Sequence, residues 1–562
     1  SSAASDVYKR QDHADPDIAH QYVVLTMNAA RLTDTHYAYT EANHVRRVEK
    51  RTTALGAEGE QLEVTETWLP AAPNEYARGR LKMKQSASGV QTVYGYEAAS
   101  QYGALYRETR ETQIAGQAVP GHSTRKVTYV SAQGNNTRVE KYALLTDGTW
   151  TLTDTADYEY DKENRWIKRT RGNGRVTERE MMCCGPLWEK DEDGIMTTYS
   201  YNTARQLVEV SRSEVTDGET IVTPETIVSY TRDAFGRILQ TRRDVGPMTT
   251  TESRAYDLLG QLVQETDVLG RSNTHAYSAD GLTETVTTPA GATLVTERHP
   301  DGSVLHEYGT GQRERYHVYD IDHNCLRETV TLADQTTILS RTLVNGFGQS
   351  VVQVTPATAG FLYDRSEYNA QGLLIRTWRD TGTQEGAVAM APTLYEYDAF
   401  GNMTRETLAL AEQPAPDNSP IREYAFSVEN AEDGVYLVTT QIRYNAQGEP
   451  LTSARKELIS ELSGVLETKT VIVDERGLTS AEWTEYAENT KRIQKSVIPS
   501  SSVTAQTVAA DGLMLSQQNH AGITETAARA YTATGVTLTR TDGRGNTCLL
   551  YTSDAADDSL RV

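Results

Sequence analysis

Short stretches of alternating apolar and polar residues run along most of this chain, and a turn-forming residue follows most of them. Residues spaced by two lie on one face of a β-strand, so Thr197, Tyr199 and Tyr201 are predicted to share a face. Strands of this kind, separated by glycine, are typical of hairpins. Glycines recur at intervals of 10 or 11 residues at Gly260, Gly270, Gly281, Gly291 and Gly302.

Two sequence frames repeat in register, and repeats of this kind define the architecture of a chain. The first frame is G-x-x-T-x-Y-x-Y, in which the threonine and both tyrosines alternate with other residues. Its spacing predicts one strand for each copy. The copies are Gly89, Thr92, Tyr94 and Tyr96; Gly194, Thr197, Tyr199 and Tyr201; Gly270 and Tyr277, with Asn and His between them; and Tyr395 and Tyr397 without the glycine.

The second frame, Y-D-x-x-G, follows the second tyrosine and has the chemistry of a turn. Asp or Asn at the end of a strand accepts a hydrogen bond from the N–H two residues on. Glycine then adopts the positive φ of the corner, and an apolar residue begins the returning strand. The copies are Tyr256, Asp257 and Gly260; Tyr397, Asp398 and Gly401; Tyr368, Asn369 and Gly372; Tyr444, Asn445 and Gly448; and Tyr160 and Asp161, with Asn164 in place of glycine.

The two-residue alternation and the 10- or 11-residue spacing of the glycines predict an all-β fold. We expect a long repetitive antiparallel sheet built from hairpins. No long segment shows helical periodicity. A sheet of so many strands twists and cannot stay flat, so we expect it to curl, close or stack.

Together the two frames resemble the YD repeat of RHS proteins. This family includes the shells of bacterial polymorphic toxins, a component of insecticidal toxin complexes, wall-associated bacterial proteins and the animal teneurins. The resemblance is densest between residues 158 and 448. It implies a β-sheet strip that curls into a spiral, hollow shell, which in toxin members encloses a C-terminal effector.

The resemblance also suggests how the chain is divided. We expect residues 85–547 to form the YD-repeat shell and residues 12–84 to be a divergent β region with degenerate repeats. Residues 1–11 and 548–562 fit no repeat, and we expect them to be fragment ends or non-native sequence. The family's D-P-x-G self-cleavage motif has no match here, so we expect the effector partner to lie outside this sequence.

Three repeats depart from the glycine pattern, and we expect altered loops there. Arg205 stands at the glycine corner, two extra residues follow Tyr230, and Tyr319 leads into a stretch without glycine. By contrast, Asn164 fits the frame, because Asn adopts positive φ more readily than other non-glycine residues.

Composition narrows the functional classes. The chain has 562 residues, a formal net charge of −22 and a mean hydropathy of −0.56. Its 31 Tyr residues are too many for a disordered chain, which is poor in aromatic residues. The acidic excess argues against a nucleic-acid partner, because phosphates are neutralised by clustered Lys and Arg. No apolar run approaches the roughly 20 residues of a membrane helix, so we predict no membrane span.

The four cysteines form no C-x-x-C pair, which argues against a zinc ribbon or a thioredoxin motif. We expect buried free thiols. A strained disulfide or a metal clip at the adjacent residues Cys183 and Cys184 remains the alternative.

Motifs for catalysis and for metal or cofactor binding are incomplete. The run from Asp320 to Asn324 opens like a calcium loop, but Gly and Glu are missing from the later positions that such a loop requires. The acidic run from Asp191 to Gly194 is interpreted as a solvated turn. The glycines at 172 and 174 lack the third glycine of a dinucleotide fingerprint. We therefore predict no enzyme activity, no catalytic residues, no metal and no cofactor.

The resemblance implies a non-catalytic structural region that forms part of a secreted or surface-delivered shell around a C-terminal effector. The alternative is an extracellular adhesion or carbohydrate-binding surface with cell-surface glycans as partners, as in wall-associated and teneurin-like members. Tyrosine ladders can serve either role, because their rings pack against cross-strand neighbours or stack on sugars. The regular spacing favours packing.

Overall fold

The computed structural model describes residues 20–28, 31–39, 49–55, 61–68, 76–77, 79–322, 325–345, 348–358, 360–369, 371–382, 389–411, 413–416, 418–487, 491–499, 502–519, 521–533 and 535–552. Within these residues the chain is β-strand and turn, apart from one short 3₁₀ element, η2 (Gln101–Gly103). The predicted all-β class is confirmed. This part of the chain also holds no helix with the length and apolar character needed to span a bilayer.

Forty-two strands of the described chain form one antiparallel sheet. The first strands are β1 (His20–Asn28), β2 (Arg31–Tyr39), β3 (Glu49–Leu55), β4 (Gln61–Trp68), β5 (Leu81–Gln85), β6 (Val90–Ala98), β7 (Tyr106–Ile114), β8 (Thr124–Val130), β9 (Asn136–Leu144), β10 (Trp150–Tyr160), β11 (Trp166–Arg171), β12 (Val176–Met181), β13 (Pro186–Lys190), β14 (Met196–Tyr201) and β15 (Leu207–Arg212). A separate hairpin, β16 (Val215–Asp217) and β17 (Thr220–Thr223), leaves the sheet between β15 and β18, which pair with each other.

The middle of the sheet continues from this hairpin without a break in the order of strands. It contains β18 (Thr226–Arg232), β19 (Ile238–Val245), β20 (Met248–Tyr256), β21 (Leu262–Thr266), β22 (Ser272–Tyr277), β23 (Thr283–Thr287), β24 (Thr293–Arg298), β25 (Val304–Tyr308), β26 (Arg315–Asp322), β27 (Cys325–Ala333), β28 (Thr337–Val344), β29 (Ser350–Ala357), β30 (Gly360–Tyr368), β31 (Leu374–Asp380) and β32 (Thr393–Tyr397).

The last strands also pair with their neighbours in sequence. They are β33 (Met403–Leu408), β34 (Ile421–Ala431), β35 (Gly434–Tyr444), β36 (Pro450–Leu458), β37 (Leu466–Val473), β38 (Thr479–Tyr486), β39 (Arg492–Val497), β40 (Val503–Val508), β41 (Met514–Gln518), β42 (Thr524–Thr532), β43 (Gly535–Thr541) and β44 (Thr547–Thr552).

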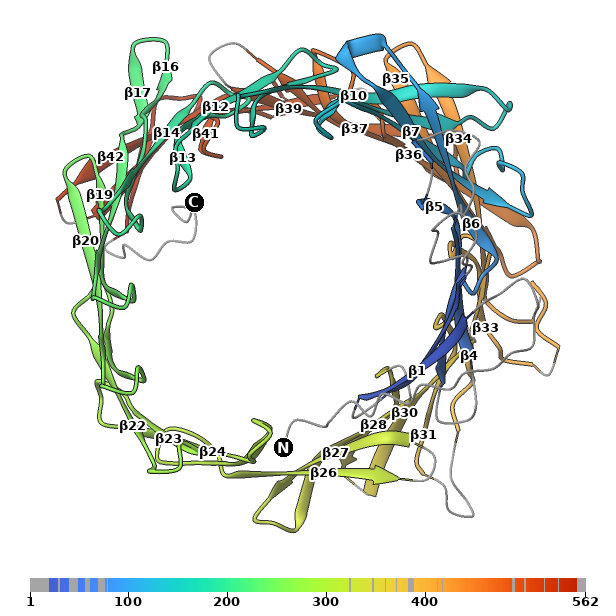
Figure 1. The fold of residues 1–562 in the computed structure, drawn as a ribbon, viewed down its shortest axis with the longest axis horizontal. Coiled ribbons are helices and arrows are strands. Elements are labelled where there is room, and N and C mark those ends of the chain that lie inside the picture. The colour runs from blue at the N-terminus through green and yellow to red at the C-terminus, as the bar shows by residue number, and fades with distance from the viewer. Residues whose placement is uncertain are drawn as a thin grey trace.

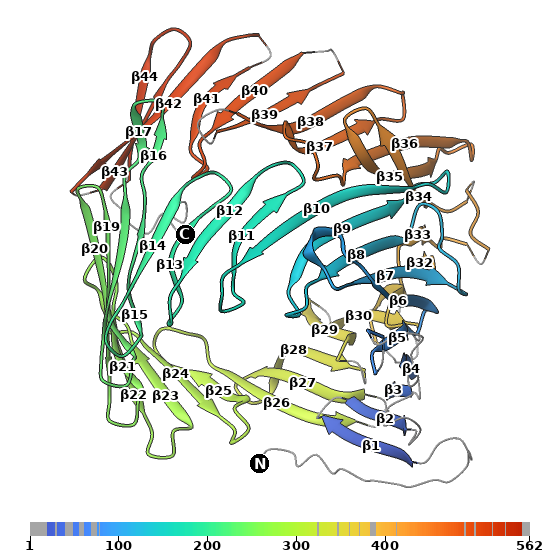
Figure 2. The ribbon, with the colours of Figure 1, turned by 45° about the horizontal axis from the view of Figure 1, so that its top comes forward.

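The sheet curls round on itself, so that its strands form a wall around an open centre (Figure 1). Figure 2 shows the later strands, drawn in orange and red, beside an arc of earlier ones. We call residues 121–245 the earlier turn and residues 398–535 the later turn. The chain exposes 32138 Å², whereas a compact protein of 62.2 kDa would expose roughly 20,000 Å². The chain is therefore a thin curled sheet, which agrees with the predicted spiral.

Each repeat ends in the same hydrogen-bonded turn, which the hairpin between β20 and β21 illustrates. The N–H of Asp257 donates to the carbonyl of Gln261 at 3.0 Å, and the Gln261 N–H returns to Asp257 Oδ1 at 2.8 Å. Gly260 closes the turn at φ +89°. A side chain would be strained at this φ, which is why glycine recurs at the corner.

A β-bulge stands at many of the motif tyrosines. A bulge places two residues of one strand opposite one residue of its partner, which bends the strand and increases its twist. The repeat therefore introduces curvature at regular intervals along the sheet. The register of the hairpin shifts in this way at Tyr160, Tyr201, Tyr256, Tyr368 and Tyr397.

The expectation of altered loops is wrong in two of the three irregular repeats. Arg205 itself adopts the corner conformation at φ +62°, and its N–H donates to the Asn202 carbonyl at 2.9 Å. The extra residues after Tyr230 lengthen the strand, and Gly236 then closes a regular turn on Asp233. Backbone N–H groups that donate to the Asp or Asn side chain thus hold the turn even where the corner residue is unfavourable. In the third repeat, residues 323 and 324 of the connecting loop lie outside the described residues.

The expectation of buried thiols is also wrong for the cysteines whose surroundings are described. Cys183 and Cys548 are exposed, and Cys184 is partly buried, all three as free thiols. A thin sheet has little interior, so even an apolar side chain remains near solvent. The surroundings of Cys325 lie outside the described residues.

Replacing a corner glycine should destabilise the chain through backbone strain alone. Gly89 adopts φ +83°, and an added methyl group there would meet no atom within 4 Å. We expect Gly89→Ala to cost about 1–2 kcal/mol, because an L-residue is disfavoured in this conformation. Gly95 in β6 is the matched control, since its φ is not positive and its methyl group would only touch Thr109 at 3.8 Å. Thermal unfolding of both variants tests this, and equal melting temperatures would contradict it.

Turns held by an aspartate should loosen in acid, whereas turns held by an asparagine should not. The backbone N–H of Leu478, at 2.8 Å from Oδ1, is the main cause that lowers the pKa of Asp474. Because the pKa of this carboxyl is lower in the folded state, its ionised form stabilises the turn at pH values above the unfolded pKa of about 3.9. This stabilisation is lost as the pH falls through the folded pKa. Asn445 makes the same two backbone hydrogen bonds without titrating.

We therefore expect amide hydrogen exchange, corrected for its intrinsic pH dependence, to accelerate at 474–478 below pH ~4 but not at 445–449. In an Asp474→Asn variant the exchange at 474–478 should no longer depend on this titration. Acceleration of equal size at both turns would show that the carboxylate is not the cause.

Candidate functional site

The earlier and later turns of the sheet meet along a line of contacts that we call the seam. Hydrogen-bonded residues across it are 274 to 313 positions apart in the sequence. The contacts come from loops and strand ends rather than from the pairing of consecutive strands. Seam residues on the earlier turn are His122, Thr146, Thr153, Arg171, Arg175, Asp193, Asp217 and Thr223, and those on the later turn are Asp398, Val428, Glu461, Tyr486, Lys491, Arg492 and Asp511.

Backbone hydrogen bonds join the two turns at one end of the seam. Thr146 donates from its N–H to the Val428 carbonyl at 2.9 Å, and the Val428 N–H donates to Thr146 Oγ1 at 2.9 Å. Further along, the Glu461 N–H donates to the Thr153 carbonyl at 2.8 Å. These bonds satisfy backbone groups that would otherwise be left unpaired at the edge of the sheet.

Two clusters of buried apolar side chains span the seam. The first joins Ala143 and Leu145 of the earlier turn to Val428 and Val435 of the later turn. The second joins Val222, in the hairpin β16–β17, to Ala509 and Leu513. Burial of apolar area contributes roughly 25 cal/mol per Å². The seam thus supplies hydrophobic stabilisation that a single exposed sheet cannot provide by itself.

An ionic cluster lies at the centre of the seam, where Asp193 of the earlier turn faces Arg492 of the later turn. Arg492 donates from Nη2 to Asp193 Oδ1 at 2.9 Å and from Nε to Glu467 at 2.9 Å. Arg175 also pairs with Asp193. Both guanidinium groups also lie over the ring of Tyr486, at 4.2 Å (Arg175) and 4.6 Å (Arg492) from its centroid. Burial is the main cause that raises the pKa of the Tyr486 hydroxyl.

The interpretation of residues 191–194 as a solvated turn is therefore wrong. The Asp191 carboxylate holds the turn by accepting the Ile195 N–H, but the Asp193 side chain is only 20 % exposed and pairs with two arginines. Its arginine partner on the later turn is separated from it by 299 positions, so no local pattern could have indicated the contact.

The hairpin β16–β17 fastens the far end of the seam. Lys491 pairs with Asp217 at 2.7 Å, and the hydroxyl of Thr223 donates to the Asp511 carboxylate. Figure 1 shows this hairpin projecting from the wall near β42. At the other end, His122 lies 3.2 Å from the Asp398 carboxylate and stacks on Phe400 at 5.1 Å.

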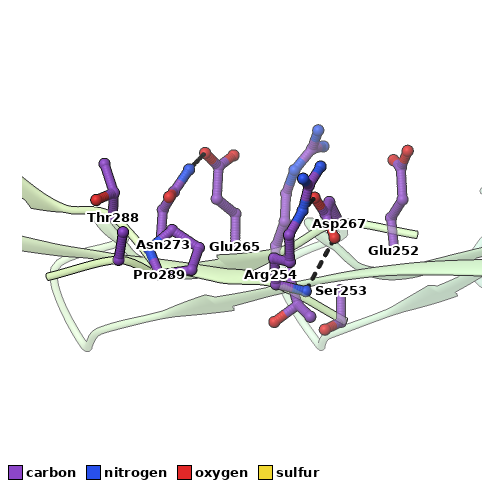
Figure 3. A pocket seen from close by; sticks show the side chains of 11 residues that line it. Glu252, Ser253, Arg254, Glu265, Asp267, Asn273, Thr288 and Pro289 are labelled. Atoms are coloured by element: carbon purple, nitrogen blue, oxygen red, sulfur yellow. Dashed lines mark hydrogen bonds and ion pairs between the residues drawn. The ribbon is translucent and has the colours of Figure 1, made fainter. Parts of the chain in front are cut away.

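The face of the sheet offers only shallow depressions. One of about 510 Å³ lies over β20 to β23, where Figure 3 shows Glu252, Arg254, Glu265 and Asn273 rising from the sheet. Asn273 donates to Glu265 at 3.1 Å, so these polar groups already satisfy one another. Among the described residues, no group of three or more His, Cys, Asp or Glu side chains is placed to hold a metal ion.

A family model described as the teneurin YD-shell matches residues 186–385. The resemblance to YD-repeat proteins is confirmed over these residues, which make up about a third of the chain.

Solved structures of toxin complexes are also similar to this chain. The crystal structure of TcdB2-TccC3 matches with 12% identity over 98% of this chain and 34% of that one, with a TM-score of 0.32. The Tc holotoxin pore of Photorhabdus luminescens matches with 12% identity over 96% and 33%, with a TM-score of 0.30. This chain thus spans about a third of the length of these structures. No curated protein sequence matches it.

The YD-repeat tyrosines tie neighbouring hairpins together. Tyr96 donates from its hydroxyl to the Leu81 carbonyl at 3.0 Å, and burial is the main cause that raises its pKa to about 12. Tyr160, Tyr201 and Tyr368 likewise donate to carbonyls of preceding strands, at 2.9 to 3.2 Å. Tyr277 and Tyr444 donate instead to the carboxylates of Glu284 and Glu423. The hydroxyls of these tyrosines therefore have partners within the sheet.

The structure distributes the predicted motif residues along the sheet and does not gather them into one site. The threonines and tyrosines lie in strands or at strand ends, and the glycines close turns at positive φ. Among them, Asp398 is the motif residue that also contacts the earlier turn, through His122. The strand positions are Thr92, Tyr94 and Tyr96 in β6, Thr197, Tyr199 and Tyr201 in β14, Tyr395 and Tyr397 in β32, and Tyr160, Tyr256, Tyr277, Tyr368 and Tyr444 at strand ends; the glycine corners are Gly89, Gly194, Gly260, Gly270, Gly281, Gly372, Gly401 and Gly448.

Breaking the ionic cluster should open the seam. The side chains of Arg492 and Asp193 are 16 % and 20 % exposed, so Arg492→Ala would remove charge-assisted hydrogen bonds to Asp193 and Glu467 in a largely enclosed cluster. Asp193 would keep only Arg175, and we expect a loss of about 2 kcal/mol of stability. Arg379→Ala is the matched control. Arg379 pairs with Asp364 across the single hairpin β30–β31, and both side chains are well exposed. That pair should contribute less than ~1 kcal/mol.

Thermal unfolding and hydrogen exchange test this prediction. Arg492→Ala should lower the melting temperature and accelerate exchange on both sides of the seam, at residues 172–194 and 486–497. An equal effect of the two substitutions, or exchange that changes on the later turn alone, would show that the pair does not fasten the turns together.

Proposed function

We propose that this YD-repeat chain forms the wall of a shell that encloses a C-terminal effector segment. The seam is the observation that carries the proposal. A sheet whose turns are fastened to one another by backbone bonds, apolar clusters and ion pairs has the closure that a container needs. The chain itself is structural, as in the YD-shell family that it matches.

The composition of the chain also supports this function. A compact enzyme buries a core, whereas this sheet exposes far more surface than a compact protein of its mass. A thin wall needs little apolar sequence, in agreement with the mean hydropathy of −0.56. Pairing of the strands protects their edges from aggregation, and a net charge of −22 favours solubility. The match to the YD-shell family supports the secreted or surface-delivered class that we propose for the protein.

The alternative function, an adhesive or glycan-binding surface, would require tyrosine rings and hydroxyls that are available to a sugar. Many motif tyrosines instead donate their hydroxyls to carbonyls or carboxylates of adjacent hairpins, as at Tyr96 and Tyr444. This arrangement favours the shell over the adhesin.

Protection of an attached segment from a protease tests the proposal. A peptide that carries the cleavage site of a sequence-specific protease is joined after Val562, and the same peptide is joined before Ser1 in a second protein. If the wall encloses the C-terminal peptide, cleavage after Val562 should be several-fold slower than in an unstructured reference peptide. Arg492→Ala should accelerate this cleavage by loosening the seam.

Equal cleavage of the C-terminal and reference peptides, with and without the seam substitution, would overturn the proposal. In that case, binding of the chain to immobilised glycans would favour the adhesive alternative. The N-terminal peptide reports whether protection is particular to the C-terminal side or is a general property of the wall.

A further inference from the structure

The hairpin turn between β12 and β13 carries two adjacent cysteines in place of the usual Asp-x-x-Gly sequence. The Met182 N–H donates to the Gly185 carbonyl at 2.8 Å, which closes the turn. Within it, the sulfur atoms of Cys183 and Cys184 lie 2.9 Å apart. Cys183 is exposed and Cys184 is partly buried. The two thiols are thus held together where small molecules in solution can reach them.

This turn lies at the edge of the wall that faces away from the seam. β12 and β13 are antiparallel, and the cysteine loop joins them at one end of the hairpin. The loops at the opposite end of the two strands, around Asn173 and Asp193, contact the later turn. The hairpin loop that carries the cysteines is therefore not required for the contact between the earlier and later turns of the sheet. A chemical change there can occur without opening the seam.

Two arginines from the neighbouring hairpin turns surround the thiols. Arg165 donates from Nη1 to the Met182 carbonyl at 2.9 Å and from Nη2 to the Met181 carbonyl at 3.2 Å, which fixes its guanidinium beside the pair. Arg205, at the corner of the next turn, interacts electrostatically with Cys184. Arg165 is itself paired with Asp161 and Glu163, so Arg205 is the positive charge that favours the thiolate, the reactive form of cysteine.

We propose that Cys183 and Cys184 form a reversible dithiol–disulfide site that reacts with low-molecular-weight disulfides. The Cys183 thiolate attacks one sulfur of the small disulfide, forms a mixed disulfide and releases the first small thiolate. Cys184 then loses its proton and attacks the Cys183 sulfur. The mixed S–S bond breaks, and the second small thiol leaves. The protein loses two hydrogen atoms, and the small disulfide is reduced to two thiols.

The order of attack follows from the surroundings of the two thiols. Cys183 is the more exposed and is the one that a small disulfide reaches first. The hydrogen bond with Cys183 is the main cause that raises the pKa of Cys184, which disfavours Cys184 as the attacking thiol. Cys183 is therefore the attacking residue and Cys184 the resolving residue.

Closure of the ring should be reversible because it is strained. Adjacent Cα atoms are about 3.8 Å apart across a trans peptide. Most disulfides join Cα atoms about 4.4–6.8 Å apart, and shorter spans store strain that makes the bond easier to reduce. A mild dithiol reductant should therefore reopen the ring with the protein still folded.

Mass spectrometry of the intact chain after incubation with oxidised glutathione tests the proposal. The background protein carries Cys325→Ser and Cys548→Ser, so that only the pair can react. We expect this protein to end two hydrogen atoms lighter and to retain no glutathione. Cys184→Ser should accumulate a stable adduct with one glutathione, because no second thiol resolves it. Cys183→Ser should react more slowly.

The proposal is overturned if the protein with both cysteines retains one glutathione as long as Cys184→Ser does, or if neither protein reacts. Circular dichroism of each variant verifies that the sheet is folded. Cys183 and Cys548 are exposed, so their substitution should leave the fold intact.

The arginines provide a second, independent measurement. Arg205→Gln should slow the first exchange step by roughly two- to fivefold, the effect of one exposed charge. Arg205→Lys, which keeps the charge, should restore the rate. Arg237→Gln is the matched control, because Arg237 follows a turn of the same kind at Asp233 but belongs to a different hairpin. Equal rates in Arg205→Gln and Arg237→Gln would remove the electrostatic part of the proposal.

Discussion

A single β-sheet exposed on both faces cannot build a hydrophobic core, and the rest of this structure depends on that constraint. Sheets ordinarily bury one face against another layer. Here both described clusters of buried apolar side chains lie where the earlier and later turns of the same sheet meet. The sheet therefore uses its own later strands in place of a second layer. Its curvature is what brings the two turns together.

That curvature has a local origin in the repeat. Many strands end in a tyrosine that stands at a β-bulge, as at Tyr256 and Tyr397. Each of these bulges bends the sheet at the same position of the repeat. The tyrosine hydroxyl then fixes the hairpin to a preceding strand, as Tyr201 does through the Pro186 carbonyl. Tyrosine suits this role better than phenylalanine because it combines a packing ring with a donor. The composition of 31 Tyr against 5 Phe follows from this need.

The hairpins were predictable from the sequence because their determinants lie within about ten residues of one another. The turn at Asp257 needs only the carboxylate, the corner glycine and the N–H groups between them. The bulges and the seam were not predictable. The partner of Asp193 is Arg492, and the distance between them along the chain is set by the accumulated curvature of all intervening strands. Arg205 shows a different limit: the Gln206 N–H donates to Asn202 Oδ1 and holds the turn despite an unfavourable corner residue.

The chemistry of the seam differs from that of a protein core, and this difference bears on what a shell can do. Its apolar clusters are small, and ion pairs such as Lys491 with Asp217 lie beside them. Ion pairs near solvent weaken with salt, whereas apolar contacts do not. The hairpins are held by backbone bonds that form independently of the seam. Both described apolar clusters lie in the seam, however, so separating the two turns of the sheet also removes hydrophobic stabilisation from the strands that flank it.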